Sequence, residues 1–143
     1  MGRRRLAREV ALQALYVADV SNTPATESFA IVTRRNGEGL DDATREFARE
    51  LALGALERRE ELDGLIQARA ENWAVNRMAA VDRNVLRLAA YELVARPDTP
   101  VGVVIDEAIE IVRKYSAEEA TRFVNGILDA LKELRQAKKS RKK

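Results

Sequence analysis

The segment that decides the fold is residues 81–93, VDRNVLRLAAYEL, near the middle of the chain. Apolar side chains cover almost every side of a helix built from it. We therefore predict a central helix over residues 83–96, with a start as early as Arg77, that is packed on several sides. The helix ends at Arg96 because a residue that precedes proline avoids the helical conformation. Its apolar residues are Val85, Leu86, Leu88, Ala89, Ala90, Tyr91, Leu93 and Val94.

The composition of the chain favours helices throughout. The 143 residues are 46% hydrophobic, with only 7 Gly and 3 Pro, which is typical of helices joined by short connections. We expect one all-α domain of about seven helices over residues 1–135. The basic residues 136–143 lack apolar periodicity and are predicted to be a disordered tail.

The first half of the chain is predicted to hold several helices. Residues 3–20 place Leu6, Ala7, Val10, Ala14, Val17 and Ala18 on one apolar arc that should face the core. A short helix over residues 25–34 and a glycine-containing loop follow. Residues 41–69 form one long helix, or two helices joined near Arg58, with Asp41 or Asp42 as the N-cap. Trp73 is expected to anchor the connection to the central helix.

Two more helices are predicted in the second half. Thr99 can cap a helix that has Pro100 at its first position and runs to Tyr115. Ser116 and Glu119 form a capping box for a last helix to about Arg135. Gly126 lies inside that helix and is expected to permit a close approach of another helix.

Several function classes are disfavoured by what the sequence lacks. It has no cysteine and no histidine, which removes thiolate chemistry, the commonest metal ligand and the commonest general base at neutral pH. It has no phosphate-binding glycine motif and no serine elbow. We therefore expect no enzyme, no cofactor and no metal. It also lacks an apolar run of 18 residues, so a cytoplasmic location is expected.

The charges of the chain are segregated along its length. Residues 1–8 carry +4, residues 132–143 carry +6 and residues 9–131 carry −8, although the net charge is only +2. The basic ends suit a polyanion, and the acidic body suits a basic protein partner.

Four arginines stand within the first eight residues. Positive charges at a helix N-terminus oppose the helix dipole and destabilise the helix. Their presence therefore suggests that they bind an anion. Guanidinium groups match phosphate geometry and stack on bases, which favours single-stranded RNA or DNA as the ligand. A solubilising tail explains the cluster equally well.

Leu12 and Tyr16 lie four residues apart and fall beside Arg5 and Glu9, opposite the apolar arc of the first helix. A leucine and a tyrosine on a charged face indicate a contact with a partner. The alternative is that the first helix is sandwiched within the fold and buries both faces.

Arg122 and Phe123 begin the amphipathic part of the last helix. Phe123 falls at the edge of the apolar stripe beside a basic residue, a pair that could stack a splayed-out base. A phenylalanine buried in the core is the alternative.

Four segments of the chain carry a family resemblance through their order and spacing: RRRLAREVALQALY (residues 3–16), VDRNVLRLAAYEL (81–93), TPVGVVIDEAIEIVRKYS (99–116) and RFVNGILD (122–129). Together they resemble the NusB family of bacterial transcription antitermination proteins. The resemblance runs from Arg3 to about Leu131. Asp106, Arg122 and Tyr115 depart modestly from the usual family residues.

The resemblance implies a fold of two small helical bundles packed roughly perpendicular, one over about residues 1–70 and the other over about 71–135. It also implies binding of the boxA element of ribosomal RNA transcripts, jointly with ribosomal protein NusE and within the transcription elongation complex. The implied RNA-binding residues are Arg3, Arg4, Arg5, Arg8, Arg122 and Phe123. The implied NusE contacts are Tyr16 and Asp82, to which the helical wheel adds Leu12.

A second hypothesis comes from a different class of protein. A scaffold that binds only proteins, such as a homodimer closed through Leu12 and Tyr16, would also explain the apolar residues on a charged helix. Some relatives self-associate, so a homodimer is also possible beside RNA binding.

Overall fold

The computed structural model describes residues 2–36 and 39–135. Every regular element in this part of the chain is helical, so the predicted all-α fold is confirmed. Seven α-helices and one 3₁₀ turn follow one another as α1 (Arg3–Ser21), α2 (Ala25–Asn36), α3 (Asp42–Glu57), α4 (Arg59–Gln67), η1 (Val75–Arg77), α5 (Ala80–Ala95), α6 (Val101–Tyr115) and α7 (Glu118–Leu131).

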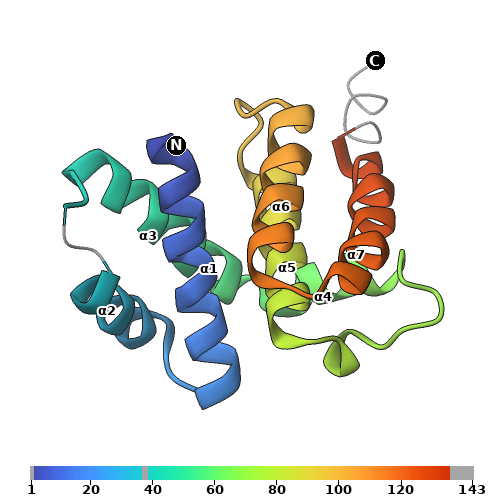
Figure 1. The fold of residues 1–143 in the computed structure, drawn as a ribbon, viewed down its shortest axis with the longest axis horizontal. Coiled ribbons are helices and arrows are strands. Elements are labelled where there is room, and N and C mark those ends of the chain that lie inside the picture. Colours follow the sequence, from blue (N-terminus) through green and yellow to red (C-terminus); the bar gives the residue numbers. More distant parts are fainter. Residues whose placement is uncertain (1, 37–38, 136–143) are drawn as a thin grey trace.

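The helices form two groups that meet along α1 and α5 (Figure 1). Helices α2 and α3 pack on α1, whereas α6 and α7 pack on α5. Helix α4 follows α3 in the chain but packs mainly against α5. The division of the chain into two bundles near residue 70 therefore stays a prediction.

Helix α5 is the centre of the fold, as its sequence predicts. Residues 84–93 are all buried, and α1, α3, α4, α6 and α7 each contact this helix. Its buried set includes Asn84, Arg87 and Glu92 as well as apolar residues. Buried polar groups are costly unless they are hydrogen-bonded, and buried charges unless they are paired, so these three side chains require partners on the neighbouring helices.

Helix α1 is sandwiched between the two groups. Its buried residues include Ala7, Val10 and Ala14 on the predicted core side and Glu9 and Leu12 on the predicted outer side. Helix α1 therefore buries residues on both faces. This agrees with the alternative prediction, in which the first helix is sandwiched within the fold. Leu6, at the end of the predicted apolar arc, is instead 39% exposed.

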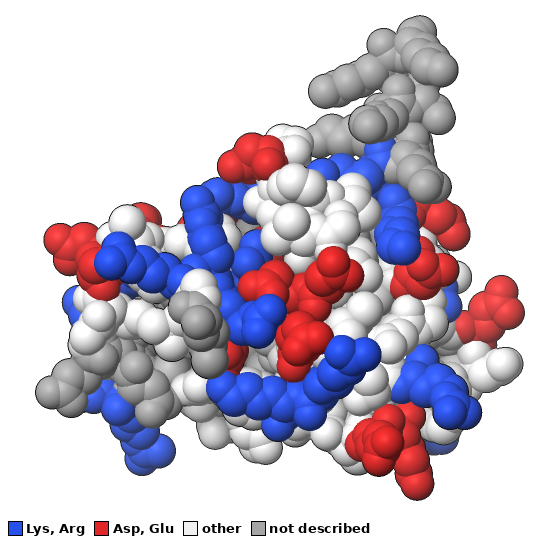
Figure 2. Space-filling model, turned by 45° about the horizontal axis from the view of Figure 1, so that its top comes forward, with Lys and Arg blue, Asp and Glu red and all other residues white. Residues whose placement is uncertain are grey.

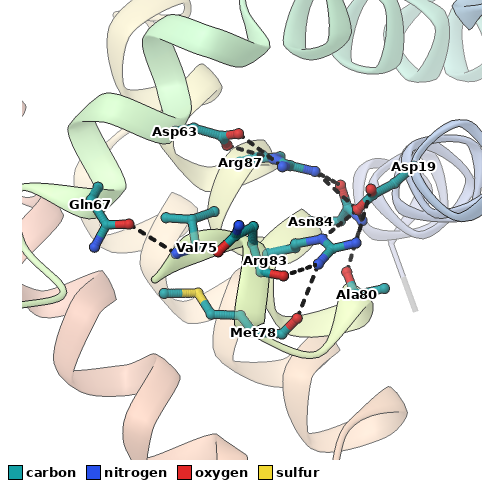
Figure 3. A network of polar contacts seen from close by, with 10 residues as sticks. Asp19, Asp63, Gln67, Val75, Met78, Ala80, Arg83, Asn84 and Arg87 are labelled. Atoms are coloured by element: carbon teal, nitrogen blue, oxygen red, sulfur yellow. Dashed lines mark hydrogen bonds and ion pairs between the residues drawn. The ribbon is translucent and has the colours of Figure 1, made fainter. Parts of the chain in front are cut away.

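Asp19 joins α1 to α5 through a network of polar side chains (Figure 3). Its carboxylate accepts hydrogen bonds from Arg83 at 2.6 and 2.9 Å, from Asn84 at 2.9 Å and from Arg87 at 3.1 Å. Arg87 also donates to Asp63 of α4 at 2.6 and 2.9 Å. Burial alone would raise the pKa of Asp19, but the hydrogen bonds from Arg83 and Asn84 and the charge of Arg87 hold that pKa below its usual value.

Two predictions about the α3–α4 region are confirmed. Asp41 caps α3, since its side chain accepts a hydrogen bond from the backbone N–H of Thr44 at 2.7 Å. The chain then forms two helices that separate at Arg58. The short helix after residue 24 is also present, and it extends to Asn36.

Buried side chains and the amide of Gln67 hold the connection between α4 and α5. Val75 and Met78 are buried, and the amide of Gln67 accepts a hydrogen bond from the backbone N–H of Val75 at 2.9 Å and donates one to the carbonyl of Trp73 at 2.7 Å. The Trp73 side chain contacts Phe123 of α7 but is 57% exposed. Trp73 therefore contributes to this connection, but it is not the buried anchor that was predicted.

Both predicted caps in the second half are wrong. Pro100 occupies the N-cap position of α6, so Thr99 lies outside the helix. Ala117 is the N-cap of α7, because the hydroxyl of Ser116 donates a hydrogen bond to Asp82 instead of closing a capping box. Helix α7 ends at Leu131, and the predicted tail at 136–143 lies outside the described residues.

The close helix approach occurs at Gly54 of α3, and the prediction for Gly126 is wrong. A Cβ added at Gly54 would overlap the ring of Tyr91 on α5, whereas a Cβ at Gly126 would meet nothing within 4 Å. Only a residue without a side chain lets α3 come this near to α5.

Substitution of alanine for each of the two glycines should affect the free energy of unfolding in different directions. Gly54→Ala is expected to lower the free energy of unfolding by about 1–3 kcal/mol because the buried Tyr91 ring must shift. Gly126→Ala should leave it unchanged or raise it by up to about 1 kcal/mol, since alanine is the better helix former. Urea unfolding followed by circular dichroism measures both. Equal effects of the two substitutions would contradict the assignment of the close approach.

Candidate nucleic-acid interface

The first turn of α1 presents a basic surface. The helix has no acidic residue in that turn and its N-cap, Gly2, offers no side chain. Arg3 is highly exposed and pairs with Asp41 at 2.7 Å. The guanidinium of Arg4 lies over the ring of Phe47, 4.0 Å from its centroid, and forms no ion pair among the described residues. Arg3 and Arg4 therefore keep charge available to an anion.

Arg5 and Arg8 are used within the fold. Arg8 is 3% exposed and donates two hydrogen bonds of 2.8 Å to Glu92. Arg5 pairs with Glu107 of α6, which also lies 3.6 Å from Arg8. The geometry does not support direct RNA binding by Arg8, because its charged group is already neutralised inside the molecule. Arg5 is partly exposed. To bind RNA, it would have to exchange its ion pair with Glu107 for one with a phosphate.

The pKa values of two groups at this end follow from these contacts. The hydrogen bond to Glu107 raises the pKa of Arg5, so its charge is permanent. Hydrogen bonds from Thr44, together with the nearby charge of Arg3, lower the pKa of Asp41. Asp41 therefore remains ionised and continues to cap α3.

Figure 2 shows Lys and Arg side chains beside a group of acidic side chains on the face that includes the top of Figure 1. The N-terminal end of α1 lies at that top, whereas α7 begins near the opposite end of the molecule (Figure 1). The predicted RNA-binding residues therefore form two separate groups. One RNA strand that contacts both groups must cross the face between them.

The start of α7 forms the second group. Arg122 is exposed, forms no ion pair within the described residues, and borders a hollow of about 660 Å³. The hollow is lined by Arg113, Ser116, Glu118, Thr121, Arg122 and Asn125. Phe123 is half-buried against the core. Its ring centroid lies 5.3 Å from that of Trp73, with 56° between the ring planes.

The predicted partner residues have different surroundings. Tyr16 is 41% exposed, but Leu12 is buried. Asp82 is also buried and accepts the hydrogen bond from Ser116. Leu12 and Asp82 are therefore not exposed in this structure, because neighbouring parts of the fold cover them, and their contact with a partner stays a prediction.

Tyr16 and Leu12 nevertheless share one feature, an apolar groove of about 310 Å³ between α1 and α2. The sequence did not reveal this groove because Ile31 and Val32 of α2 form part of it. Its lining residues are Leu12, Gln13, Tyr16, Val17, Ile31, Val32, Arg35, Val81 and Tyr115.

Glu9 ties α1 to the end of α6 beside this groove. Its carboxylate accepts hydrogen bonds from Lys114 at 2.7 Å and from the hydroxyl of Tyr115 at 2.5 Å. The bond to Glu9 raises the pKa of Lys114, and burial together with the same carboxylate raises the pKa of Tyr115. The groove wall at Tyr115 is thus fixed in place.

Comparison with known proteins identifies the family. The NusB family profile matches residues 5–133. The chain belongs to the NusB family. It is 49% identical to the transcription antitermination protein NusB of Elusimicrobium minutum, with 95% of this chain and 97% of that protein covered. It is 48% identical to the NusB of Trichlorobacter lovleyi, with 92% and 91% covered.

Solved NusB structures share this fold. The structure of T. maritima NusB matches with a TM-score of 0.82 and 39% identity, over 92% of this chain and 90% of that one. The crystal structure of antitermination factors NusB and NusE in complex with dsRNA matches with a TM-score of 0.84 and 31% identity, over 96% and 98%. The predicted family membership is therefore confirmed.

Among residues 2–36 and 39–135, none of the helices combines the length and the hydropathy that a membrane span requires. Nor does this part of the chain bring together three acidic side chains, or any histidine or cysteine, in a group that could hold a metal ion.

The buried position of Arg8 leads to a stability prediction. Arg8→Ala should lower the free energy of unfolding by about 3–5 kcal/mol, because Glu92 is left charged, buried and unpaired. Arg3→Ala, which removes an exposed ion pair, should cost about 1 kcal/mol or less. The double variant Arg8→Met, Glu92→Leu should recover most of the loss. Urea unfolding compares the three, and equal losses for Arg8→Ala and Arg3→Ala would refute this role of Arg8.

Proposed function

We propose that this protein is a non-catalytic transcription antitermination factor that binds boxA-type RNA of ribosomal RNA transcripts together with ribosomal protein NusE. Family membership supports the proposal, as does the solved NusB–NusE complex with dsRNA, which matches almost the whole chain. A factor that acts on nascent transcripts would work in the bacterial cytoplasm, within the transcription elongation complex.

The observation that carries the proposal is the set of arginines left available to phosphate. Arg3 and Arg4 at the start of α1 and Arg122 on α7 are exposed, and none of them is held in a buried ion pair. Arginine contacts to phosphate give affinity without sequence preference. Phe123, at the edge of the core beside Arg122, supplies an aromatic surface for an unpaired base.

The groove beside Tyr16, between α1 and α2, supports a protein contact. Its lining is mostly apolar, and Tyr16 projects from it with two-fifths of its surface exposed. Tyrosines in such positions often dominate the energy of an interface. The −8 charge of residues 9–131 would attract a basic protein such as NusE.

RNA binding can be tested through its salt dependence. If Arg3, Arg4 and Arg122 each neutralise one phosphate, log K for single-stranded boxA RNA should fall with log salt concentration with a slope of about −2. Arg3→Ala with Arg4→Ala should bring the slope to about −0.7, on boxA and on scrambled RNA alike. Arg34→Ala with Arg59→Ala removes the same charge from α2 and α4 and serves as the control. Gel shifts at several salt concentrations provide the data.

A wild-type slope near zero, or equal slopes for the two double variants, would contradict the arginine model. The same gel shifts with double-stranded RNA show which form of boxA is bound. Repeating them with NusE tests joint binding.

The proposed NusE contact at the groove can be tested separately. Tyr16→Ala should weaken NusE binding in calorimetry by about tenfold or more, and should leave binding of RNA alone unchanged because the groove and the arginine end of α1 are separate. Val20→Ala, at another exposed position on α1, is the control. A light-scattering dimer that Tyr16→Ala dissociates, in a protein that retains no RNA, would favour the protein-only scaffold instead.

A further inference from the structure

Trp73 is a large aromatic side chain that is exposed at the surface. It lies in the connection between α4 and α5, and Val75, Met78 and Gln67 fix that connection. More than half of its surface is accessible, although a large aromatic residue gains stability from burial. It is also the only tryptophan of the chain. Its exposure therefore points to a contact outside the fold.

The neighbour of Trp73 is the aromatic residue already placed in the RNA site. The indole packs against Phe123, with ring centroids 5.3 Å apart and the planes tilted by 56°. Figure 1 shows the α4–α5 connection beside the start of α7. Phe123 is half-buried, so Trp73 offers the larger accessible aromatic surface of the two.

We propose that Trp73 stacks on an unpaired base of the bound RNA and extends the platform that begins at Phe123. This inference rests on the proposed function of the α7 surface. Each base has a π-face, so an exposed indole can bind one without reading its sequence. The base must be unpaired, because bases within a duplex are already stacked.

Arg122 favours RNA over a protein partner at Trp73. It precedes Phe123 on α7, is exposed and has no ion pair among the described residues, so it can contact a phosphate that flanks the stacked base. The charges within the connection itself are mixed, because Glu71 and Arg77 are both exposed there. The apolar groove suited to a protein lies elsewhere, between α1 and α2.

The single tryptophan makes the contact directly observable. When boxA RNA is titrated into the intact protein, the tryptophan fluorescence should be quenched, and the quenching should saturate at the same RNA concentration as the gel shift. Bound RNA should also shield the indole from acrylamide. Binding in the gel shift without any change in fluorescence would overturn the proposal and leave the proposed function standing.

Substitutions separate stacking from charge and from packing. Trp73→Ala should weaken RNA binding about 5- to 100-fold and leave the salt slope unchanged, whereas Arg122→Ala should change the slope by about 0.7. Trp73→Phe should keep most of the affinity. Trp73→Leu, which still covers Phe123 but cannot stack, should behave like Trp73→Ala. Val20→Ala is the control for loss of an exposed apolar side chain.

Three outcomes would overturn the inference. Full affinity in Trp73→Leu would show that the residue only packs on Phe123. Quenching by NusE without RNA, together with weaker NusE binding by Trp73→Ala, would assign the surface to a protein contact. Absence of all RNA binding in the gel shift would remove the proposed function as well. Thermal unfolding of each variant confirms that the fold is retained.

Discussion

The ion pair between Arg8 and Glu92 sets the constraint on which the rest of the structure depends. Both side chains are almost completely buried, one on α1 and one on α5. Two such charges are tolerable only when they meet each other with good geometry. Their meeting fixes the depth and rotation of α1 against α5, and α2 and α3 then cover the remaining side of α1.

The division of labour among the first arginines follows from this constraint. A helix repeats every 3.6 residues, so orienting Arg8 inward also turns Arg5 toward Glu107 on α6. Arg3 and Arg4 precede the buried stretch and remain at the surface. The arginine cluster thus forms buried or partly buried ion pairs at Arg5 and Arg8 and an exposed basic surface at Arg3 and Arg4, a combination that neither a solubilising tail nor a pure RNA clamp describes.

Features that depend on neighbouring residues were predictable from the sequence, and features that depend on distant ones were not. Asp41 caps α3 through a residue three positions away, and the central position of α5 follows from its own apolar surface. Leu12 lies beside Arg5 and Glu9 on the helical wheel and Asp82 is charged, but both side chains are buried in the fold. The close approach at Gly54 involves Tyr91 of another helix, and no helical wheel shows that pairing. Trp73 stands among polar residues in ENWAVNR, and that pattern alone could have indicated exposure.

The same long-range contacts order the assembly of the molecule during synthesis. The partners of Arg8 and Arg5 lie 84 and 102 residues further along the chain. While the ribosome is still making the first half of the chain, α2 and α3 can already pack on α1, but Arg8 and Arg5 have no counterpart. The first helix to be translated is therefore among the last to complete its contacts. The ion pairs of Arg8 and Arg5 form only when α5 and α6 have emerged.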